Sequence, residues 1–309
     1  MKNFLIGAVA LALFGMMACQ PTATTSSTDE KEEMKEPDFK ISLAQWSLHK
    51  AFFDSSLSAD DFPSIAAGYG INSIELVNQF YKDKAEDMEY WKTFKQACDD
   101  AKVSVGLIMC DGLGHLGDAD EAKRNEAVAN HHNWVDIAKL LGAHSIRVNA
   151  AGEGTAEEVA ANAAMGLKKL GEYGATQGIN VIVENHGGYS SDGSWLAGVI
   201  STANMENVGT LPDFGNFCIE RSADGCANEY DRYKGTKEIM PFAKGVSAKS
   251  NVFDEEGNEA NMDYMKLMKI VKEAGYKGYV GIEYEGKELS EDEGIKATKA
   301  LLEKVFAAI

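Results

Sequence analysis

Acidic residues recur beside the ends of short apolar segments in this chain. Glu75 and Glu184 lie near the ends of two such segments, Asp213 follows a third, and Glu283 ends a fourth. Carboxylates are unusual inside buried strands, so their repeated placement needs an explanation. Grouped carboxylates can remove and return a proton or hold a divalent cation. Acid–base or metal chemistry is therefore the first hypothesis for this chain.

Basic and polar side chains accompany these acids. Residues two apart on a strand point to the same face. Four such pairs occur, namely Arg147 with Asn149, Glu184 with His186, Ser247 with Lys249, and Glu283 with Glu285. Taken singly, each residue has an ordinary explanation, such as a helix-cap partner or a turn. Taken together they indicate one functional site, in which Arg147, Arg221 or a bound divalent cation would neutralise the converging carboxylates.

The segments that must position these residues alternate between short apolar runs and stretches of helical spacing. Strands are predicted at Lys40–Trp46, Ser73–Val77, Ser104–Met109, Ser145–Asn149, Asn180–Glu184, Asn207–Leu211, Gly245–Lys249 and Tyr279–Glu283. Eight strands alternating with helices over about 270 residues match an α/β fold, the single-domain (β/α)8 TIM barrel, whose active sites lie at the C-terminal ends of the strands. A doubly wound sheet is the alternative, but it would need a glycine-rich phosphate loop where Gln45-Trp46-Ser47-Leu48 stands.

The last predicted helix has a clear start and a clear buried face. Ser290-Glu291-Asp292-Glu293 matches a capping box. Ile295, Leu302 and Val305 follow at helical spacing and are expected to face the core.

Composition excludes several classes of function. The 309 residues include 48 Asp and Glu against 30 Lys and Arg, for a formal net charge of −18. So acidic a chain should repel phosphate backbones, and we expect no nucleic-acid partner. Only four basic residues are arginines (Arg124, Arg147, Arg221 and Arg232), so bidentate phosphate clamps are scarce as well.

The N-terminus carries the features of an export signal. Lys2 precedes the apolar stretch 4–17, which is too short for a comfortable membrane span, and Met16-Met17-Ala18-Cys19 resembles the lipobox of bacterial lipoproteins. We therefore predict a lipoprotein signal peptide over residues 1–19 with lipidation at Cys19, a flexible tether over 20–37, and the barrel over 38–309. A plain secretory signal is the alternative. The predicted location is the periplasmic side of a membrane, contacted through the lipid anchor only.

Export changes how the remaining cysteines are interpreted. Cys218 and Cys226 lie eight residues apart in a predicted loop, and a disulfide between them is plausible in an oxidising compartment. Cys98 and Cys110 lie in apolar segments and are expected to be buried thiols.

Four motifs in the second half of the chain together resemble the sugar phosphate isomerase/epimerase family. They are Val183-Glu184-Asn185-His186-Gly187-Gly188, Leu211-Pro212-Asp213-Phe214-Gly215-Asn216-Phe217, Val246-Ser247-Ala248-Lys249 and Gly281-Ile282-Glu283-Tyr284-Glu285-Gly286. The resemblance covers the chain from about Lys40 to the C-terminus and implies a xylose-isomerase-like TIM barrel. It is specific for the superfamily and weak for substrate.

The resemblance also implies a divalent metal, with Glu184, Asp213 and Glu283 as ligands. One position departs from the family pattern, because Ser247 stands where relatives have a histidine ligand. A serine hydroxyl is a poor ligand, so the site would favour manganese or magnesium over zinc, or metal binding would be lost. In the second case Lys249 would act as the counter-charge among the carboxylates.

The chemistry implied is proton abstraction next to a carbonyl, with Glu184 and Glu283 as acid–base groups and Lys249 stabilising the enediolate. Three hypotheses follow: an isomerase or epimerase of a neutral sugar or keto-sugar, a lyase or hydratase of 3-keto-glycosides, and a non-catalytic sugar-binding lipoprotein. The expected partner is a small carbohydrate, and the oligomeric state stays open. Expected substrate contacts are His186, Asn216, Glu75, Trp46 and Arg147, with His49 and His115 on loops that could also reach the substrate.

Overall fold

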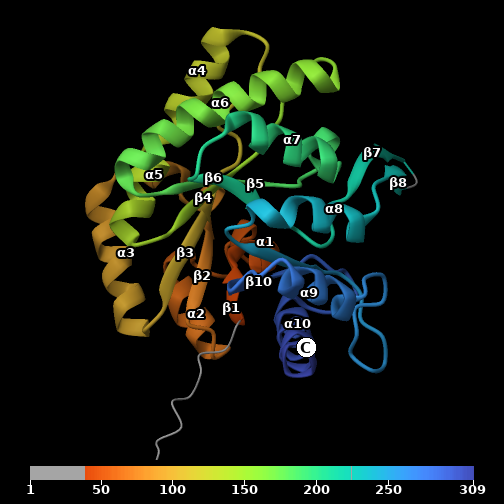
Figure 1. Ribbon diagram of the computed structural model, residues 1–309. Helices are drawn as coiled ribbons and strands as arrows, with labels where there is room; N and C mark the ends of the chain where they lie inside the picture. Colours follow the sequence, from red (N-terminus) through yellow and green to blue (C-terminus); the bar gives the residue numbers. More distant parts are fainter. Residues whose placement is uncertain (1–38, 224) are drawn as a thin grey trace, which may run out of the picture. The chain divides into compact units, whose positions relative to one another are not determined.

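The computed structural model describes residues 39–223 and 225–309 (Figure 1). The predicted signal segment, the lipidation site Cys19 and the predicted tether lie outside the described residues. None of the helices in the described part of the chain has the length and apolarity that crossing a bilayer requires.

Eight parallel strands form one sheet. They follow one another in the order β6-β5-β4-β3-β2-β1-β10-β9. Their bounds are β1 Phe39–Ala44, β2 Ser73–Val77, β3 Ser104–Met109, β4 Ser145–Val148, β5 Asn180–Glu184, β6 Val208–Leu211, β9 Val246–Ser250 and β10 Gly278–Tyr284. Parallel bridges from Thr210 to Ala243 and from Asp213 to Ser247 join β6 to β9 and close the ring. The predicted TIM barrel is therefore confirmed.

Helices follow the strands and cover the outside of the barrel (Figure 1). They are α1 His49–Phe53, α2 Phe62–Gly68, α3 Met88–Ala101, α4 Glu121–Asn130, α5 His132–Leu141, α6 Ala156–Gln177, α7 Gly193–Ala203, α8 Arg232–Ile239, α9 Tyr264–Glu273 and α10 Glu291–Ala308. Short 3-10 helices span Gln45–Leu48, Ala59–Asp61, Asn78–Lys84, Gly188–Ser191 and Met240–Phe242. The capping box at Ser290 and Glu293 is present, and Ile295, Leu302 and Val305 are buried, as predicted.

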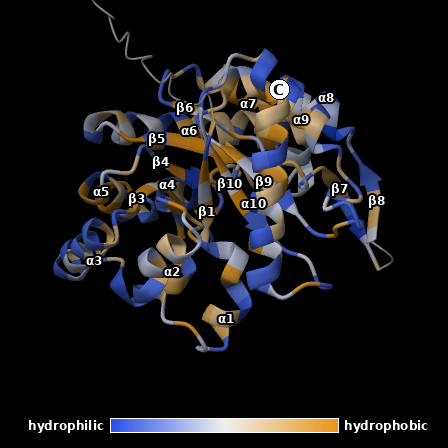
Figure 2. Cartoon of the chain, turned by 90° about the horizontal axis from the view of Figure 1, so that it is seen from below, coloured by the Kyte–Doolittle hydropathy of each residue, from blue (hydrophilic) through white to orange (hydrophobic). Residues whose placement is uncertain are grey.

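The core has two layers. A small cluster that includes Leu107, Ile182 and Leu211 fills the barrel, whereas a larger one packs between the sheet and the helices. Hydrophobic residues accordingly concentrate on strands such as β5, and hydrophilic ones on outer helices such as α3 (Figure 2). This packing fixes the C-terminal strand ends on which the polar residues stand.

One element differs from the sequence-based expectation. The segment around the two cysteines, predicted as a loop, forms an antiparallel hairpin of β7 (Cys218–Ser222) and β8 (Gly225–Glu229). A disulfide joins Cys218 to Cys226 across it, while Cys98 and Cys110 are buried free thiols. Hairpin residues are mostly exposed, so no apolar alternation marked them as strands.

Candidate active site

Three carboxylates converge at the C-terminal mouth of the barrel. Glu184 ends β5, Asp213 follows β6, and Glu283 lies on β10. One oxygen from each lies within 4.8 Å of the others. All three residues are at most 4% exposed. Because carboxylates are almost never buried without partners, the groups around them decide what the cluster can do.

Backbone and amide groups orient Asp213. Its main-chain N–H donates to Asn185 Oδ1 at 2.8 Å, and Asn185 Nδ2 donates back to the Asp213 carbonyl at 2.9 Å. The N–H groups of Gly215 and Asn216 donate to Asp213 Oδ1 at 2.9 and 2.8 Å. Asn216 Nδ2 also donates to Glu184 Oε1 at 2.9 Å. The turn after β6 therefore leaves Asp213 Oδ2 to face the cluster.

Ser247 links two of the carboxyl groups. Its Oγ lies 2.6 Å from Asp213 Oδ2 and 2.8 Å from Glu283 Oε2. A hydroxyl carries one hydrogen, so it can donate a full hydrogen bond to only one of the two carboxyls, and a proton on the other would complete the second contact. Burial, opposed by Lys249 and reinforced by Glu283, raises the pKa of Asp213 to about 7. Asp213 therefore accepts a proton more readily than Glu283, whose pKa is lowered.

Lys249 supplies positive charge to the same cluster. Its Nζ lies 3.4 Å from Glu283 Oε1, 3.4 Å from Glu285 Oε1 and 4.0 Å from Asp213 Oδ2. Burial opposes the charged amine, but Asp213 and Glu283 outweigh it and raise the Lys249 pKa well above its usual value. Burial likewise opposes ionisation of Glu283, but Lys249 and the Ser247 hydrogen bond lower its pKa. Glu283 is thus an ionised carboxylate at neutral pH.

Arg147 on β4 holds Glu184. Its Nε lies 2.9 Å from Glu184 Oε2, and its terminal nitrogens donate to the two oxygens of Asp111 at 2.6 and 3.3 Å. Asn149 Nδ2 donates to Asp111 Oδ1 at 2.7 Å. Burial raises the pKa of Glu184 to about 7 although Arg147 opposes this, so Glu184 takes both protonation states near neutrality.

Asp111 is a site residue that the sequence-based predictions do not include. It follows the strand Ser104–Met109 by two residues, as Asp213 follows its own strand. Burial opposes its ionisation, but the paired guanidinium holds its pKa well below the usual range. Arg221, expected to neutralise the acids, is instead exposed on β7. Lys249 is the second cation of the cluster.

The remaining predicted substrate contacts lie at different depths. Trp46 Nε1 donates to Glu285 at the mouth. Glu75 is deeper, where its Oε1 accepts from Ser42 at 2.6 Å, and a Cβ on Gly281 would lie 2.5 Å from it. Glu75 is 3% exposed.

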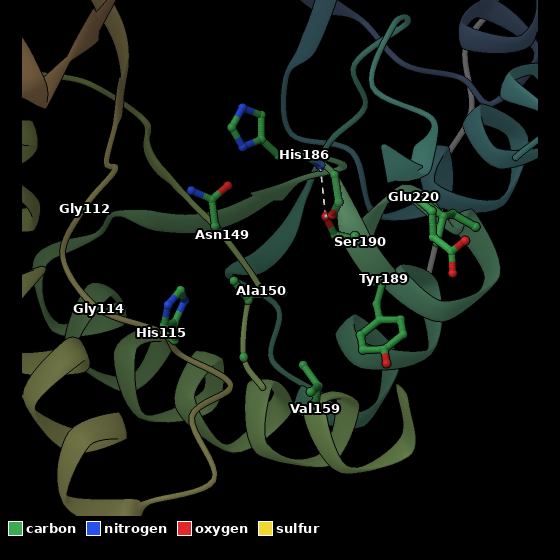
Figure 3. A pocket seen from close by; sticks show the side chains of 15 residues that line it. Gly112, Gly114, His115, Asn149, Ala150, Val159, His186, Tyr189, Ser190 and Glu220 are labelled. Carbon is green, nitrogen blue, oxygen red and sulfur yellow. Dashed lines mark hydrogen bonds between the residues drawn. The ribbon is translucent and has the colours of Figure 1, made fainter. Parts of the chain in front are cut away.

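His186 stands at the edge of a neighbouring cavity. This cavity has a volume of about 720 Å³ and is also lined by His115 and Asn149. Figure 3 shows His115 and Asn149 on one side of it and Tyr189 and Glu220 on the other. The loops after β3, β4 and β5 and the hairpin strand β7 form its walls.

The donor set of the cluster fits a hard divalent cation. Glu184, Asp213 and Glu283 offer buried carboxylate oxygens close enough to share one ion, and oxygen-only sites suit magnesium and manganese. Ser247 places a neutral hydroxyl beside Asp213, one of these ligands.

Eight parallel strands with acids gathered at their C-terminal ends define a TIM barrel of the kind that carries its active site at this mouth. The chain belongs to the family described as Xylose isomerase-like TIM barrel, whose model matches residues 63–305. No curated protein matches the sequence.

Solved structures share the fold at low sequence identity. A D-psicose 3-epimerase in the presence of D-fructose has a TM-score of 0.66 and 12% identity, covering 86% of this chain and 99% of its own. A 3-keto-D-glucoside 4-epimerase from E. coli has a TM-score of 0.61 and 14% identity, covering 87% and 100%. A xylose isomerase-like protein from Mycobacterium smegmatis, in complex with magnesium, has a TM-score of 0.60 and 17% identity, covering 81% and 88%.

Proposed function

We propose that this protein is an isomerase or epimerase of a neutral sugar or keto-sugar, acting by proton abstraction next to a carbonyl through an enediolate. The observation that carries the proposal is the pair Glu184 and Glu283. Both are buried in one carboxylate cluster, yet each has its own cation, Arg147 or Lys249. Mere binding of a sugar needs no such pair of carboxylates.

The two carboxylates suit opposite halves of a proton transfer. Glu283, ionised through Lys249, is the base that removes a proton from the carbon beside the carbonyl. Glu184, with its pKa near 7, is the acid that returns a proton. Return to the opposite face of the same carbon inverts it, and return to the neighbouring carbon gives the isomer.

The enediolate oxygen needs a positive partner as its charge develops. The Lys249 ammonium lies at the mouth and supplies one. A divalent ion held by Glu184, Asp213 and Glu283 would add Lewis-acid polarisation of the carbonyl. His186 and Asn216, beside the cluster, are the proposed groups that orient the sugar hydroxyls.

A neutral substrate suits the charges of the site. Arg147 and Lys249 are the cations of the cluster, and both are already paired with carboxylates. A phosphate dianion brought to this mouth would meet paired cations and ionised acids. The free-energy cost of desolvating it would therefore not be offset by new ion pairs.

The test follows hydrogen exchange at carbon. The purified protein is incubated in D2O with ketohexoses, aldoses and methyl 3-keto-glucoside, with added manganese or with chelator, and products are followed by NMR. We expect deuterium uptake beside the carbonyl with wild type, and a loss of about a hundredfold or more in Glu184→Gln and in Glu283→Gln.

Glu259→Gln is the matched control. Glu259 is also a buried glutamate, but its carboxylate accepts backbone N–H groups of Val252 and Asn261, away from the cluster. Full activity in Glu184→Gln would contradict the proposal. Release of an alcohol or second sugar would assign a 3-keto-glycoside lyase, and binding without exchange would assign a sugar-binding lipoprotein.

We also propose that the protein is exported and anchored to a membrane by lipid at Cys19, as its sequence predicts. The test is membrane fractionation of cells that express wild type or Cys19→Ala. Recovery of both proteins in the soluble fraction would overturn this assignment.

A further inference from the structure

We propose that the cavity beside the carboxylate cluster is a second sugar subsite, so that the substrate is a disaccharide rather than a free monosaccharide. The reacting ring would lie over Glu184 and Glu283, and the ring linked to it would lie in the cavity. This inference rests on the proposed function, because it assigns the reacting ring to the cluster.

His186 connects the two places. It follows Glu184 by two residues and lines the cavity. Its imidazole is exposed. The wall residue Asn149 reaches the cluster as well, because it donates to Asp111, and Asp111 shares Arg147 with Glu184. A ligand that contacts His186 from the cavity is therefore next to the cluster.

The volume of the cavity is more than one ring requires. At about 30 Å³ for each heavy atom, which is the share of a liquid water molecule and an upper bound for bonded atoms, the dozen or so heavy atoms of a hexose fill at most about 360 Å³. The cavity measures about 720 Å³, and Glu184, Asp213 and Glu283 are not among its lining residues. A reacting ring at the cluster thus leaves the cavity free for a second ring.

The walls carry the groups that recognise a sugar. Two imidazoles, the Asn149 amide and the Glu220 carboxylate line the cavity together with the Tyr189 ring. Sugar hydroxyls both donate and accept hydrogen bonds, and this mixture of donors and acceptors matches them. Asn149 Oδ1 is a buried acceptor without a hydrogen-bond partner among the described residues. Such orphan acceptors are rare, and this one belongs to a residue of the cavity wall.

The outer wall is held by the disulfide. Ile219 and Glu220 stand on β7 between the linked Cys218 and Cys226, and both line the cavity. A covalent link within the hairpin restrains this wall, whereas a site for a single ring over the cluster would not need it.

The test fills the cavity without touching the cluster. Ile219→Trp places a large side chain on the cavity wall, and Ala227→Trp, on the exposed face of the same hairpin, is the matched control because Ala227 does not line the cavity. Hydrogen exchange in D2O is measured for methyl 3-keto-glucoside and for a 3-keto-disaccharide such as 3-keto-cellobiose. Calorimetry measures the binding of both.

We expect wild type and Ala227→Trp to have a kcat/KM for the disaccharide at least tenfold above that for the methyl glycoside, because two or three added hydrogen bonds give about this factor. Ile219→Trp should lose this advantage and retain exchange of the methyl glycoside. Equal kcat/KM for both substrates in wild type, or an equal loss on both in Ile219→Trp, would overturn the subsite.

The two proposals fail separately. If neither substrate exchanges, the proposed function is wrong, and calorimetry then decides the subsite. Tighter binding of the disaccharide that Ile219→Trp abolishes and Ala227→Trp preserves would support the subsite without catalysis. Absence of that difference would overturn it.

Discussion

Ser247 determines the electrostatics of the carboxylate cluster, because it brings one hydrogen and no charge to a place between Asp213 and Glu283. A neutral hydroxyl cannot compensate two buried anions. The Lys249 ammonium therefore supplies the positive charge, and the raised pKa of Asp213 favours its protonated form. A divalent ion would compete with both for the same oxygens.

This competition gives a prediction for metal binding. Manganese or magnesium at about 100 times its Kd should raise the free energy of unfolding by about 2.7 kcal/mol. At the metal concentration used for wild type, Lys249→Met should show a larger increase, because the ammonium no longer shares Glu283 with the ion and the Kd falls. Asp213→Asn should abolish it. Thermal denaturation with metal and with chelator measures each effect. An equal metal-induced shift in wild type and both variants would contradict the assigned ligands.

Arg147 positions Glu184 rather than reacting itself, since its guanidinium is buried and paired with Asp111 and Glu184. Arg147→Met should lower the free energy of unfolding by about 3–5 kcal/mol at neutral pH, because two buried carboxylates lose their partner. Arg221→Met, at an exposed arginine, should change it by less than about 0.5 kcal/mol. Urea unfolding measures both variants. Equal stability of the two would show that the buried ion pairs contribute nothing.

The loss of Arg147 should also show in the pH profile. Without the guanidinium, the pKa of Glu184 rises further, so the activity limb that depends on Glu184 should move to higher pH. A variant that merely unfolds would lower activity at every pH and leave the limb in place.

At the level of elements, strands buried on both faces could be predicted well and the exposed hairpin could not. The sequence predicts Ser73–Val77, Ser104–Met109 and Asn180–Glu184 with the bounds that the structure has, because apolar runs bounded by turn residues mark them. The hairpin lacks such a run.

The residues of the candidate site could likewise be predicted only in part. Glu184, Asp213 and Glu283 could be predicted because each stands at a recognisable strand end. The bridging role of Ser247 and the Asp111–Arg147 pair depend on side chains from adjacent strands that meet only once the strands pair. The spacing of these residues in the sequence does not show that their side chains lie close together.

Two glycines in helices differ in the space around them. A Cβ on Gly294 in α10 would lie 2.2 Å from the Tyr284 ring, whereas one on Gly198 in α7 would meet nothing within 4 Å. Alanine favours a helix over glycine by about 1 kcal/mol. Gly198→Ala should therefore stabilise the protein by up to about 1 kcal/mol, and Gly294→Ala should destabilise it by about 1–3 kcal/mol through overpacking. Thermal and urea unfolding check the signs, and a gain in both variants would mean that α10 can shift freely from β10.

For the whole molecule, the balance of charge inside the barrel matters more than the net charge of −18. Buried acids in the barrel outnumber Arg147 and Lys249, so ionising all of them without a bound cation is unfavourable. The raised pKa values of Glu75, Glu184 and Asp213 follow from this excess, so we expect the free energy of unfolding to depend on pH.

The pH dependence of stability can be measured at one residue, Glu75, because it lies below the cluster in the barrel. Burial is the main cause that raises its pKa from 4.5 to about 7. The Ser42 hydrogen bond and Arg147 oppose the shift, and Glu283 and Glu184 add to it. Between about pH 4.5 and 7 the folded state thus binds more protons at Glu75 than the unfolded state, so the free energy of unfolding falls as pH rises through this window. Above about pH 7 this contribution to the free energy of unfolding is lost completely.

Glu75→Gln should remove this part of the dependence, because the amide does not titrate and its oxygen can still accept from Ser42. The variant should gain about 1–3 kcal/mol on wild type between pH 4.5 and pH 8, since one pKa unit corresponds to about 1.4 kcal/mol. Glu184 and Asp213 titrate in both proteins, so the difference between the two stability curves reports Glu75. Urea unfolding at pH 4.5, 6 and 8 measures it. A difference that is constant across the three values would mean that Glu75 is already ionised in the folded barrel, held there by Arg147.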